Sequence, residues 1–348
     1  MKLKNFLAVI ALFISTISLA QETDMSLIPY RQGNKWGYAN TDKKIIITPA
    51  YEEANWFSNG FASVKIGTKY GYINREGKLV IPAKFTVAKP FRKGYIPKAN
   101  NPEGDTVLFA GASLVASGEE ICINTKGTTL LKCPAISESS VPENTTPVET
   151  KMVEKNYSLA NNNGLFDKIH DDYKITGTDE TYYIASKNNI YGVFNSKFDT
   201  IVPFEYSMIK INRKAPVAFL ELNRNGLYGV ASTDGKITVN PEYDNMIAVN
   251  GTDGNEYLIL KKAGKIYVKD ISNTDIIPSG YADITYDNGG FVITDAANLK
   301  GFYFNGKRII QPKYQDIKWL KGTGYLAVKT VSGKQGFINT SGEEYFTE

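Results

Sequence analysis

Hydrophobic and polar residues follow one another in short runs along most of this chain. Residues 69–74 alternate, residues 75–77 supply a turn, and residues 78–81 run back as a partner. Such runs, separated by tight turns, are typical of β-hairpins. A further run at residues 62–66 predicts a third strand, and residues 326–329 repeat it. No window shows sustained helical periodicity, so we expect an all-β protein built from three-stranded meanders.

The hairpin pattern recurs with fixed landmarks, first seen in KWGYAN at residues 35–40 and KYGYIN at residues 69–74. Its first landmark is a glycine with the residue before it: Trp36-Gly37, Tyr70-Gly71, Tyr191-Gly192, Tyr228-Gly229, Lys300-Gly301 and Gln335-Gly336. A proline follows 11 or 12 residues later at Pro49, Pro82, Pro203, Pro241 and Pro312. An aromatic residue comes two or three residues after that proline, at Tyr51, Phe85, Tyr206, Tyr243 and Tyr314. With degraded copies at residues 119–134, 163–187 and 265–295, the pattern predicts a tandem array of about eight β-meander repeats.

Each landmark has an expected role. The glycine should let neighbouring aromatic rings cross its strand closely, and the aromatic residue before it should pack between repeats. Proline should end the second strand of the hairpin, because it has no amide donor. Asp234-Gly235 and Asn305-Gly306 occupy the turn, where such dipeptides favour tight hairpins. A repeat of 34–37 residues cannot bury its own apolar face, so neighbouring repeats must stack.

The repeats divide into two groups. Residues 21–134 hold about three and residues 158–348 about five. Residues 135–157 between them are rich in Ser, Thr, Pro and Glu, a composition typical of a linker. Residues 25–31 resemble a lone third strand and residues 334–346 the first two, so the ends could complete a closed propeller-like ring. The linker favours an open, solenoid-like array instead.

The first 20 residues predict export. Lys2 and Lys4 precede an apolar run from Phe6 to Ile14, and Ser18 and Ala20 are small residues at the expected positions before a cut. We expect cleavage after Ala20. No Cys follows the cut, so a lipoprotein is not expected, and no later segment is apolar enough to span a membrane. The mature chain would then be periplasmic, on the outer surface or secreted.

Composition excludes several classes of partner. Without Lys2 and Lys4 the chain has 38 basic and 36 acidic residues, which gives no electrostatic reason to bind nucleic acid or an anionic membrane. One His and two Cys do not suit His-rich or Cys-rich metal sites, and the sequence indicates no cofactor. Cys122 and Cys133 flank a predicted turn, where export permits a disulfide. The alternative is two buried thiols.

Three clusters of polar residues could carry chemistry. His170 lies among carboxylates in residues 167–172 and could act as a general base for a Ser or Thr nucleophile. Residues 250–256 (NGTDGNE) could hold Ca²⁺, although they lack the spacing of an EF-hand loop. Glu52-Glu53 and Glu119-Glu120 could supply acids for hydrolysis. A solvated loop, a turn and surface acids explain the three clusters more simply, so no catalytic residue or metal site is predicted.

Trp56 and Trp319 are candidate ligand-binding residues. Each lies five residues after a landmark tyrosine, where other repeats place Pro90, Ile211 or Ala248. A slot that is not uniformly aromatic need not serve the fold, and exposed aromatic rings are common anchors for proteins and sugars. The alternative is that both rings cover local loops against the core.

The landmark residues resemble the bacterial WG-repeat family, also written KWG repeats. The resemblance is specific at residues 35–99, good at 190–245 and 300–346, and weak between. Only Trp36 supplies a Trp before Gly, and Tyr, Lys or Gln fills that place elsewhere. The resemblance implies a β-rich repeat protein, often exported, that acts as an interaction module without a catalytic signature.

We therefore expect a non-catalytic scaffold that binds an envelope or extracellular protein or peptide. The alternative is a module for envelope glycans, and a loop-based hydrolase is a third hypothesis.

Overall fold

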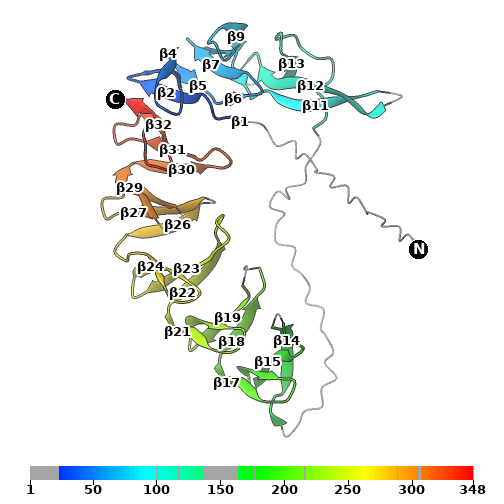
Figure 1. Cartoon of the computed structure of the whole chain (residues 1–348), viewed down its shortest axis with the longest axis vertical. Helices are drawn as coiled ribbons and strands as arrows, with labels where there is room; N and C mark the ends of the chain where they lie inside the picture. The colour runs from blue at the N-terminus through cyan, green and yellow to red at the C-terminus, as the bar shows by residue number, and fades with distance from the viewer. Residues whose placement is uncertain are drawn as a thin grey trace, which may run out of the picture. The chain divides into compact units, whose positions relative to one another are not determined.

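The structure is a computed structural model that describes residues 23–98, 101–115, 118–136, 164–175, 177–214, 217–287, 289–304 and 307–347 (Figure 1). The leader, Asn305-Gly306 and most of the expected linker lie outside these residues. The described residues form strands and turns and contain no α-helix, so the expected all-β fold is confirmed. They group into two compact units, residues 1–148 with 345–348, and residues 149–344.

The first unit contains three repeat sheets. Their strand orders are β33-β2-β3-β4, then β5-β7-β8-β9, and then β10-β12-β11 with β13 also paired to β12, while β1 pairs with β6 alone. The strands are β1 (Thr23–Asp24), β2 (Ile28–Gln32), β3 (Lys35–Ala39), β4 (Ile45–Tyr51), β5 (Glu53–Ala54), β6 (Phe57–Ser58), β7 (Ala62–Ile66), β8 (Lys69–Ile73), β9 (Leu79–Phe85), β10 (Val87–Ala88), β11 (Arg92–Lys98), β12 (Asn101–Ser113), β13 (Ile121–Asn124) and β33 (Phe346–Thr347).

The second unit contains five sheets that follow one another in chain order (Figure 1). Four have four strands each, and the last, β30-β31-β32, has three. The strands are β14 (Lys168–Lys174), β15 (Thr181–Lys187), β16 (Ile190–Asn195), β17 (Thr200–Tyr206), β18 (Met208–Asn212), β19 (Phe219–Arg224), β20 (Leu227–Ser232), β21 (Ile237–Tyr243), β22 (Asn245–Asn250), β23 (Glu256–Lys262), β24 (Lys265–Asp270), β25 (Asp275–Ile277), β26 (Asp283–Asp287), β27 (Gly290–Thr294), β28 (Lys300–Phe304), β29 (Lys307–Tyr314), β30 (Asp316–Leu320), β31 (Tyr325–Lys329) and β32 (Gln335–Asn339).

The typical repeat has four antiparallel strands, one more than the sequence predicts. The landmark glycine lies on the third strand and the landmark proline on the fourth, as in β20 and β21. The missed strand is the first, which begins two residues after the landmark aromatic residue, as β18 begins at Met208 after Tyr206. Pro203 also lies inside β17 and does not end it. A proline is tolerated there because the fourth strand is an edge of its sheet.

The hydrophobic cores lie between consecutive sheets, as the stacking argument requires. One core joins Tyr182 and Val193 of the β14–β17 sheet to Leu220 and Leu222 of the next. Equivalent buried clusters join the first three sheets of the first unit and the β18–β29 sheets of the second. The aromatic residue before the glycine packs against such a core at Tyr70 and Tyr191. Each repeat is therefore stabilised by its neighbours.

The landmark glycine makes room for backbone rather than for rings. The fourth strand bulges where it passes this glycine, since Trp36 pairs with Tyr51 but Tyr38 with Ile47. A Cβ atom on Gly37 would lie 2.2 Å from the carbonyl oxygen of Ile47. Gly71, Gly229 and Gly301 face backbone at 2.5–2.6 Å in the same way. Gly192 fits the ring expectation, because its Cβ would meet the Phe204 ring at 2.6 Å.

A polar cap closes the turn between the third and fourth strands, and the sequence analysis missed it. Three residues after the glycine, the side chain of Asn74 accepts a 2.9 Å hydrogen bond from the Lys78 N–H. The capping position is occupied by Asn40, Asn74, Asn124, Asn195, Ser232, Asp270 and Asn339. Three residues after the cap, φ is positive in every case, at Lys43, Gly77, Gly127, Phe198, Gly235, Asn273 and Gly342. Glycine suits this left-handed position because it has no side chain to clash.

Candidate binding surface

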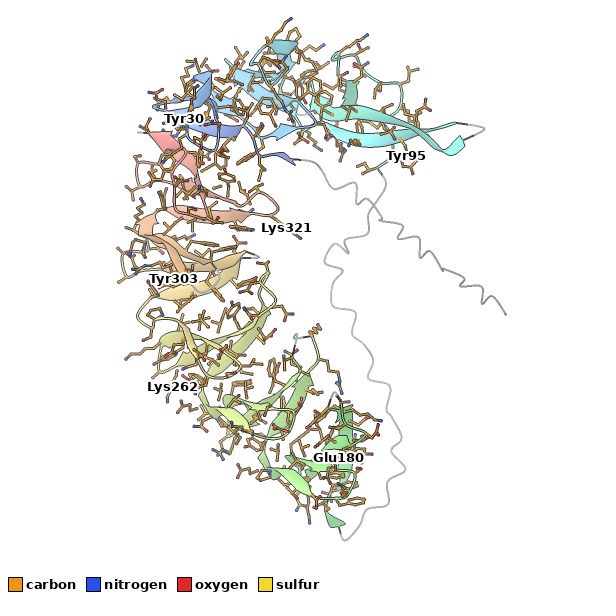
Figure 2. The ribbon with its side chains drawn as sticks, viewed as in Figure 1. Tyr30, Tyr95, Glu180, Lys262, Tyr303 and Lys321 are labelled. Atoms are coloured by element: carbon orange, nitrogen blue, oxygen red, sulfur yellow. A yellow bond between two sulfur atoms is a disulfide. The ribbon has the colours of Figure 1, made fainter. Side chains whose placement is uncertain are left out.

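The first strands of the second unit offer open backbone edges. Among the described residues, β18, β22, β26 and β30 each pair with one neighbour and end their sheets. An edge strand carries unpaired N–H and C=O groups that can bind another extended chain. These four strands form the candidate binding surface, and Lys321, in the loop after β30, lies beside it in Figure 2.

Hydrogen bonding fixes which amides point outward from this surface. The N–H just before β18, of Ser207, donates to the Asn223 carbonyl at 2.8 Å. Met208 lies opposite the same Asn223, so β18 begins with a bulge. Because alternate residues of a strand bond to the same neighbour, the N–H groups of Met208 and Lys210 point into the sheet and that of Ile211 points away. The residues that precede the other three strands make the same inward bond. The Gly251 N–H donates to the Asn255 carbonyl in the register of β22 with β23, and the Trp319 N–H donates outward to the Asp287 carboxylate. The outward amides near the middle of the four strands therefore belong to Ile211, Ala248, Tyr286 and Trp319.

The residues directly before these four positions have exposed side chains. Ile247 has 54% of its surface accessible, and Lys210, Thr285 and Lys318 are also exposed. They are here named the edge row. The row combines two cationic side chains with one apolar and one hydroxyl side chain, and acidic residues lie on the same strands at Asp283 and Asp316. This mixed surface suits a polypeptide better than a polyanion.

Proline distinguishes the two edges of a sheet. The fourth strands carry Pro203, Pro241 and Pro312, whereas β18, β22, β26 and β30 contain no proline. Proline blocks strand addition because it lacks the donor that a new partner would need. The fourth strand β25 (Asp275–Ile277) ends just before Pro278, and the last sheet has no fourth strand. In the other three sheets of the second unit, only the first-strand edge is left without this block.

Polar contacts link successive sheets beside the surface. The Arg213 guanidinium forms two hydrogen bonds with the Asp171 carboxylate, at 2.8 and 3.0 Å. Further along, the Thr252 N–H donates to the Tyr286 hydroxyl at 3.2 Å and the Trp319 N–H donates to the Asp287 carboxylate at 2.9 Å. These contacts fix the first strands of successive sheets relative to one another.

Trp319 lies on β30, where its ring packs against the preceding sheet. The ring stacks on Phe302 and Phe304, with centroid separations of 6.0 and 5.2 Å. Gly289 is required beneath it, since a Cβ there would lie 2.3 Å from the indole. One face of Trp319 is therefore used inside the array. Trp56 lies between β5 and β6 and is half-buried.

The slot of the two tryptophans serves packing in other repeats as well. Ile211 and Ala248 pack against the cores that their sheets share with the preceding sheets, and Tyr286 packs against a third such core. The sequence comparison missed this shared role because the slot residues differ in size and type.

His170 has a serine partner but no oriented acid. Its Nε2 lies 2.8 Å from the Ser186 hydroxyl, and its ring stacks on Tyr191 with centroids 4.6 Å apart. Burial, with a smaller effect from Lys168, lowers the pKa of His170. Ser186 is only 6% exposed, and the Asp171 carboxylate is bound to Arg213. The arrangement therefore lacks the positioned carboxylate of a catalytic triad.

The other polar clusters are used within turns and ion pairs. The Asp253 carboxylate accepts hydrogen bonds from the Asn255 N–H at 3.1 Å and from the Tyr257 hydroxyl at 2.5 Å. Burial and this bond raise the pKa of Tyr257 to about 12. Glu52 pairs with Lys35 at 2.8 Å and Glu53 with Lys65 at 2.6 Å, while Glu120 pairs with Lys89. Each of these acids has a structural partner.

The two cysteines form a disulfide across the hairpin of the third sheet. Cys122 lies on β13 and Cys133 follows 11 residues later, with Cα atoms 5.3 Å apart. The Leu130 N–H also donates to the Cys122 carbonyl at 2.7 Å. The bond closes a repeat that lacks a regular fourth strand.

One acid of the 250–256 cluster is buried, which the sequence analysis did not predict. Glu256 begins β23, is only 7% exposed, and its Oε2 accepts no hydrogen bond among the described residues. Burial, and to a smaller degree the charge of Glu221, raises the pKa of Glu256. Sequence alone gave no signal, because Glu256 directly follows a polar loop.

None of the described residues forms a helix that is long and apolar enough to cross a membrane.

Comparison with known proteins gives a family for part of the chain. Residues 36–70 and 70–97 match the family described as WG containing repeat. No curated protein matches the sequence.

Solved structures show only distant similarity. Kluyveromyces lactis Hsv2 is 10% identical with a TM-score of 0.24, over 47% of this chain and 58% of that chain. Dihydro-heme d1 dehydrogenase NirN in complex with DHE is 10% identical with a TM-score of 0.29, over 93% and 73%. PorZ of Porphyromonas gingivalis, described as a surface component of the type-IX secretion system, is 11% identical with a TM-score of 0.24, over 92% and 38%. Similarities at these TM-scores carry no argument about this chain. Residues 36–97, which include Trp36-Gly37 and Tyr70-Gly71, match this family as two adjacent repeats.

Proposed function

We propose that this protein is an exported, non-catalytic interaction protein that binds an extended segment of an envelope or extracellular protein. The observation that carries the proposal is the set of four proline-free edge strands, β18, β22, β26 and β30, in consecutive sheets. An extended peptide added to such an edge gains main-chain hydrogen bonds, and alternate side chains give it specificity. Export rests on the leader at residues 1–20, and the lack of a catalytic role rests on the paired acids and the Ser186–His170 geometry.

The test is an affinity purification with matched variants. Tagged residues 21–348 would be incubated with solubilised envelope from the source cell, and co-eluting proteins identified by mass spectrometry. Ile211→Pro and Tyr286→Pro together remove two outward amides without breaking a bond to the next strand. Ile211→Ala and Tyr286→Ala together remove the same side chains and keep the amides.

Strand addition predicts that the proline pair loses the partner and the alanine pair keeps it. Equal loss in both pairs would mean recognition by side chains. Full retention in both pairs would place the interaction away from the first-strand edges and contradict the proposal.

The glycan alternative depends on the two tryptophans. Trp319 uses one ring face against Phe302 and Phe304, which leaves less of it for a sugar. Saturable glycan binding that is lost in Trp56→Ala and Trp319→Ala, while the proline pair binds normally, would favour that alternative.

A further inference from the structure

The first repeat lacks a first strand of its own. The residues before β2 form β1, which pairs with β6, at Thr23 with Ser58. The vacant position beside β2 is filled by β33 from the other end of the chain, with Arg31 opposite Phe346 and Gln32 opposite Thr347. This pairing is parallel, whereas the first strands of the other repeats are antiparallel to their partners. The C-terminal segment thus occupies a strand position that the repeat does not supply itself.

Two aromatic side chains anchor the segment. Tyr345 is 1% exposed and its hydroxyl donates to the Thr41 carbonyl at 3.0 Å. Phe346 is also buried, with the Arg31 guanidinium 5.4 Å from its ring centroid. Arg31 is itself buried and its Nη1 lies 3.5 Å from the Thr347 carbonyl. The site therefore combines a backbone edge, a Tyr pocket and a cation beside an aromatic ring.

The backbone part of this contact is small. The Arg31 N–H donates to the Tyr345 carbonyl at 3.3 Å and the Gly33 N–H donates to the Thr347 carbonyl at 3.2 Å. By comparison, β18 pairs with β19 along all of Met208–Asn212. A two-residue strand held by few backbone bonds can leave its site without disrupting the sheet that receives it.

We propose that the edge of β2 is a peptide-acceptor site whose resident ligand is the chain's own segment Tyr345–Thr347, and that it accepts the same segment from a second copy. This site lies in the first unit and is independent of the edge row, so either proposal can fail alone. Exchange of an identical element between copies is a low-cost route to dimers. The second copy would make the contacts that Arg31 and Thr41 now make within one chain.

The direct test uses a chain that ends at Glu344. Truncation there keeps the contacts of Glu344 with Lys313 and Tyr314, both at 2.6 Å. A fluorescent peptide of residues 343–348 should bind this chain saturably at one site, and the full chain at least tenfold more weakly. Phe346→Ala in the peptide should weaken binding at least tenfold. A truncated chain with an unchanged circular dichroism spectrum that does not bind the peptide would overturn the proposal.

A second test uses the full chain, so that it does not depend on the truncated chain folding. Gln32 and Thr347 are both exposed and opposite each other. A Gln32→Cys chain and a Thr347→Cys chain would be mixed, oxidised and mapped by mass spectrometry. A disulfide joining positions 32 and 347 of different chains is expected, and Ser341→Cys, outside the segment, should not form one with Gln32→Cys. Failure of Thr347→Cys to exceed this control would contradict the exchange.

Discussion

One methyl group decides whether the third and fourth strands of a repeat can pair as they do. A Cβ on Gly229 would lie 2.5 Å from the Val239 carbonyl oxygen and 2.6 Å from the Pro241 nitrogen. Neither backbone atom can rotate away, so Gly229→Ala should lower the free energy of unfolding by about 3 kcal/mol. Urea denaturation followed by circular dichroism would measure this.

The control for this change is Gly226→Ala. Gly226 has φ of +82° and nothing within 4 Å of its Cβ position, so only the backbone cost of about 1–2 kcal/mol applies. Equal losses in the two variants would mean that the bulge of the fourth strand moves easily and that the close approach is not what requires glycine.

Lys43 is a residue whose replacement should stabilise the protein. It lies at the positive-φ position of the β3–β4 turn with φ of 59°, where Gly77 and Gly127 lie in the next two repeats. Its side chain is exposed, so Lys43→Gly relieves backbone strain without removing packing, a gain of about 1 kcal/mol. Lys44→Gly, at the neighbouring position without positive φ, should instead lose about 0.5–1 kcal/mol. Thermal unfolding of both variants would test the difference in sign.

Glu256 should make stability depend on pH. Its pKa is raised by burial and by Glu221, so the folded chain holds the proton more tightly than the unfolded chain. Its favourable contribution is fully present below the usual glutamate range and is lost as pH rises through the raised pKa. Glu256→Gln should therefore change little near pH 4 and stabilise by about 1 kcal/mol near pH 8.

Urea midpoints at the two pH values would test this. The exposed Asp316 should show the opposite sign, because its hydrogen bond to Lys300 lowers its pKa. A Glu256→Gln variant that is equally destabilised at both pH values would show that the carboxylate makes a favourable contact.

At the scale of elements, the sequence determines the third and fourth strands and leaves the first undetected. Glycine, proline and the landmark aromatic residue lie on the third and fourth strands because steric and donor constraints are strict there. The first strand, such as MIKIN in β18, is held on one side only, and its composition is free to vary. For the same reason the slot of Trp56 and Trp319 looked functional, although Trp319 packs between sheets. The edge row could not be found without knowing that these residues form strands.

The third sheet depends on a covalent bond where others have regular pairing. Its β13 strand is followed by an isolated bridge between Ile123 and Thr129 rather than by a full fourth strand. Cys122→Ala with Cys133→Ala should lower the free energy of unfolding of the first unit by about 2–3 kcal/mol, the effect of a short closed loop. Reductant should lower the wild-type stability by the same amount and leave the variant unchanged. A wild-type chain insensitive to reductant would show that the disulfide adds nothing to folding.

At the scale of the molecule, the repeat count follows from sequence but the role of the last residues does not. Landmarks counted along the chain predict about eight repeats, and the described residues form three repeat sheets in one unit and five in the other. Sequence places residues 345–348 with the second group, whereas they belong to the first unit. A two-residue parallel strand has no periodicity to detect, so only the coordinates identify its partner.

A local defect should spread only to neighbouring sheets. Each core is shared by two consecutive sheets, and the clusters of the first unit contain no residue from the β18–β21 sheet. In such an array stability is a sum of repeat and nearest-neighbour contributions. Gly229→Ala should therefore speed amide exchange about 100-fold in β14–β25, a loss of about 3 kcal/mol. The β7–β9 amides should exchange at the wild-type rate. Amide hydrogen exchange would be measured by mass spectrometry. If the whole chain instead unfolds as one cooperative body, the exchange rate should rise equally in both units.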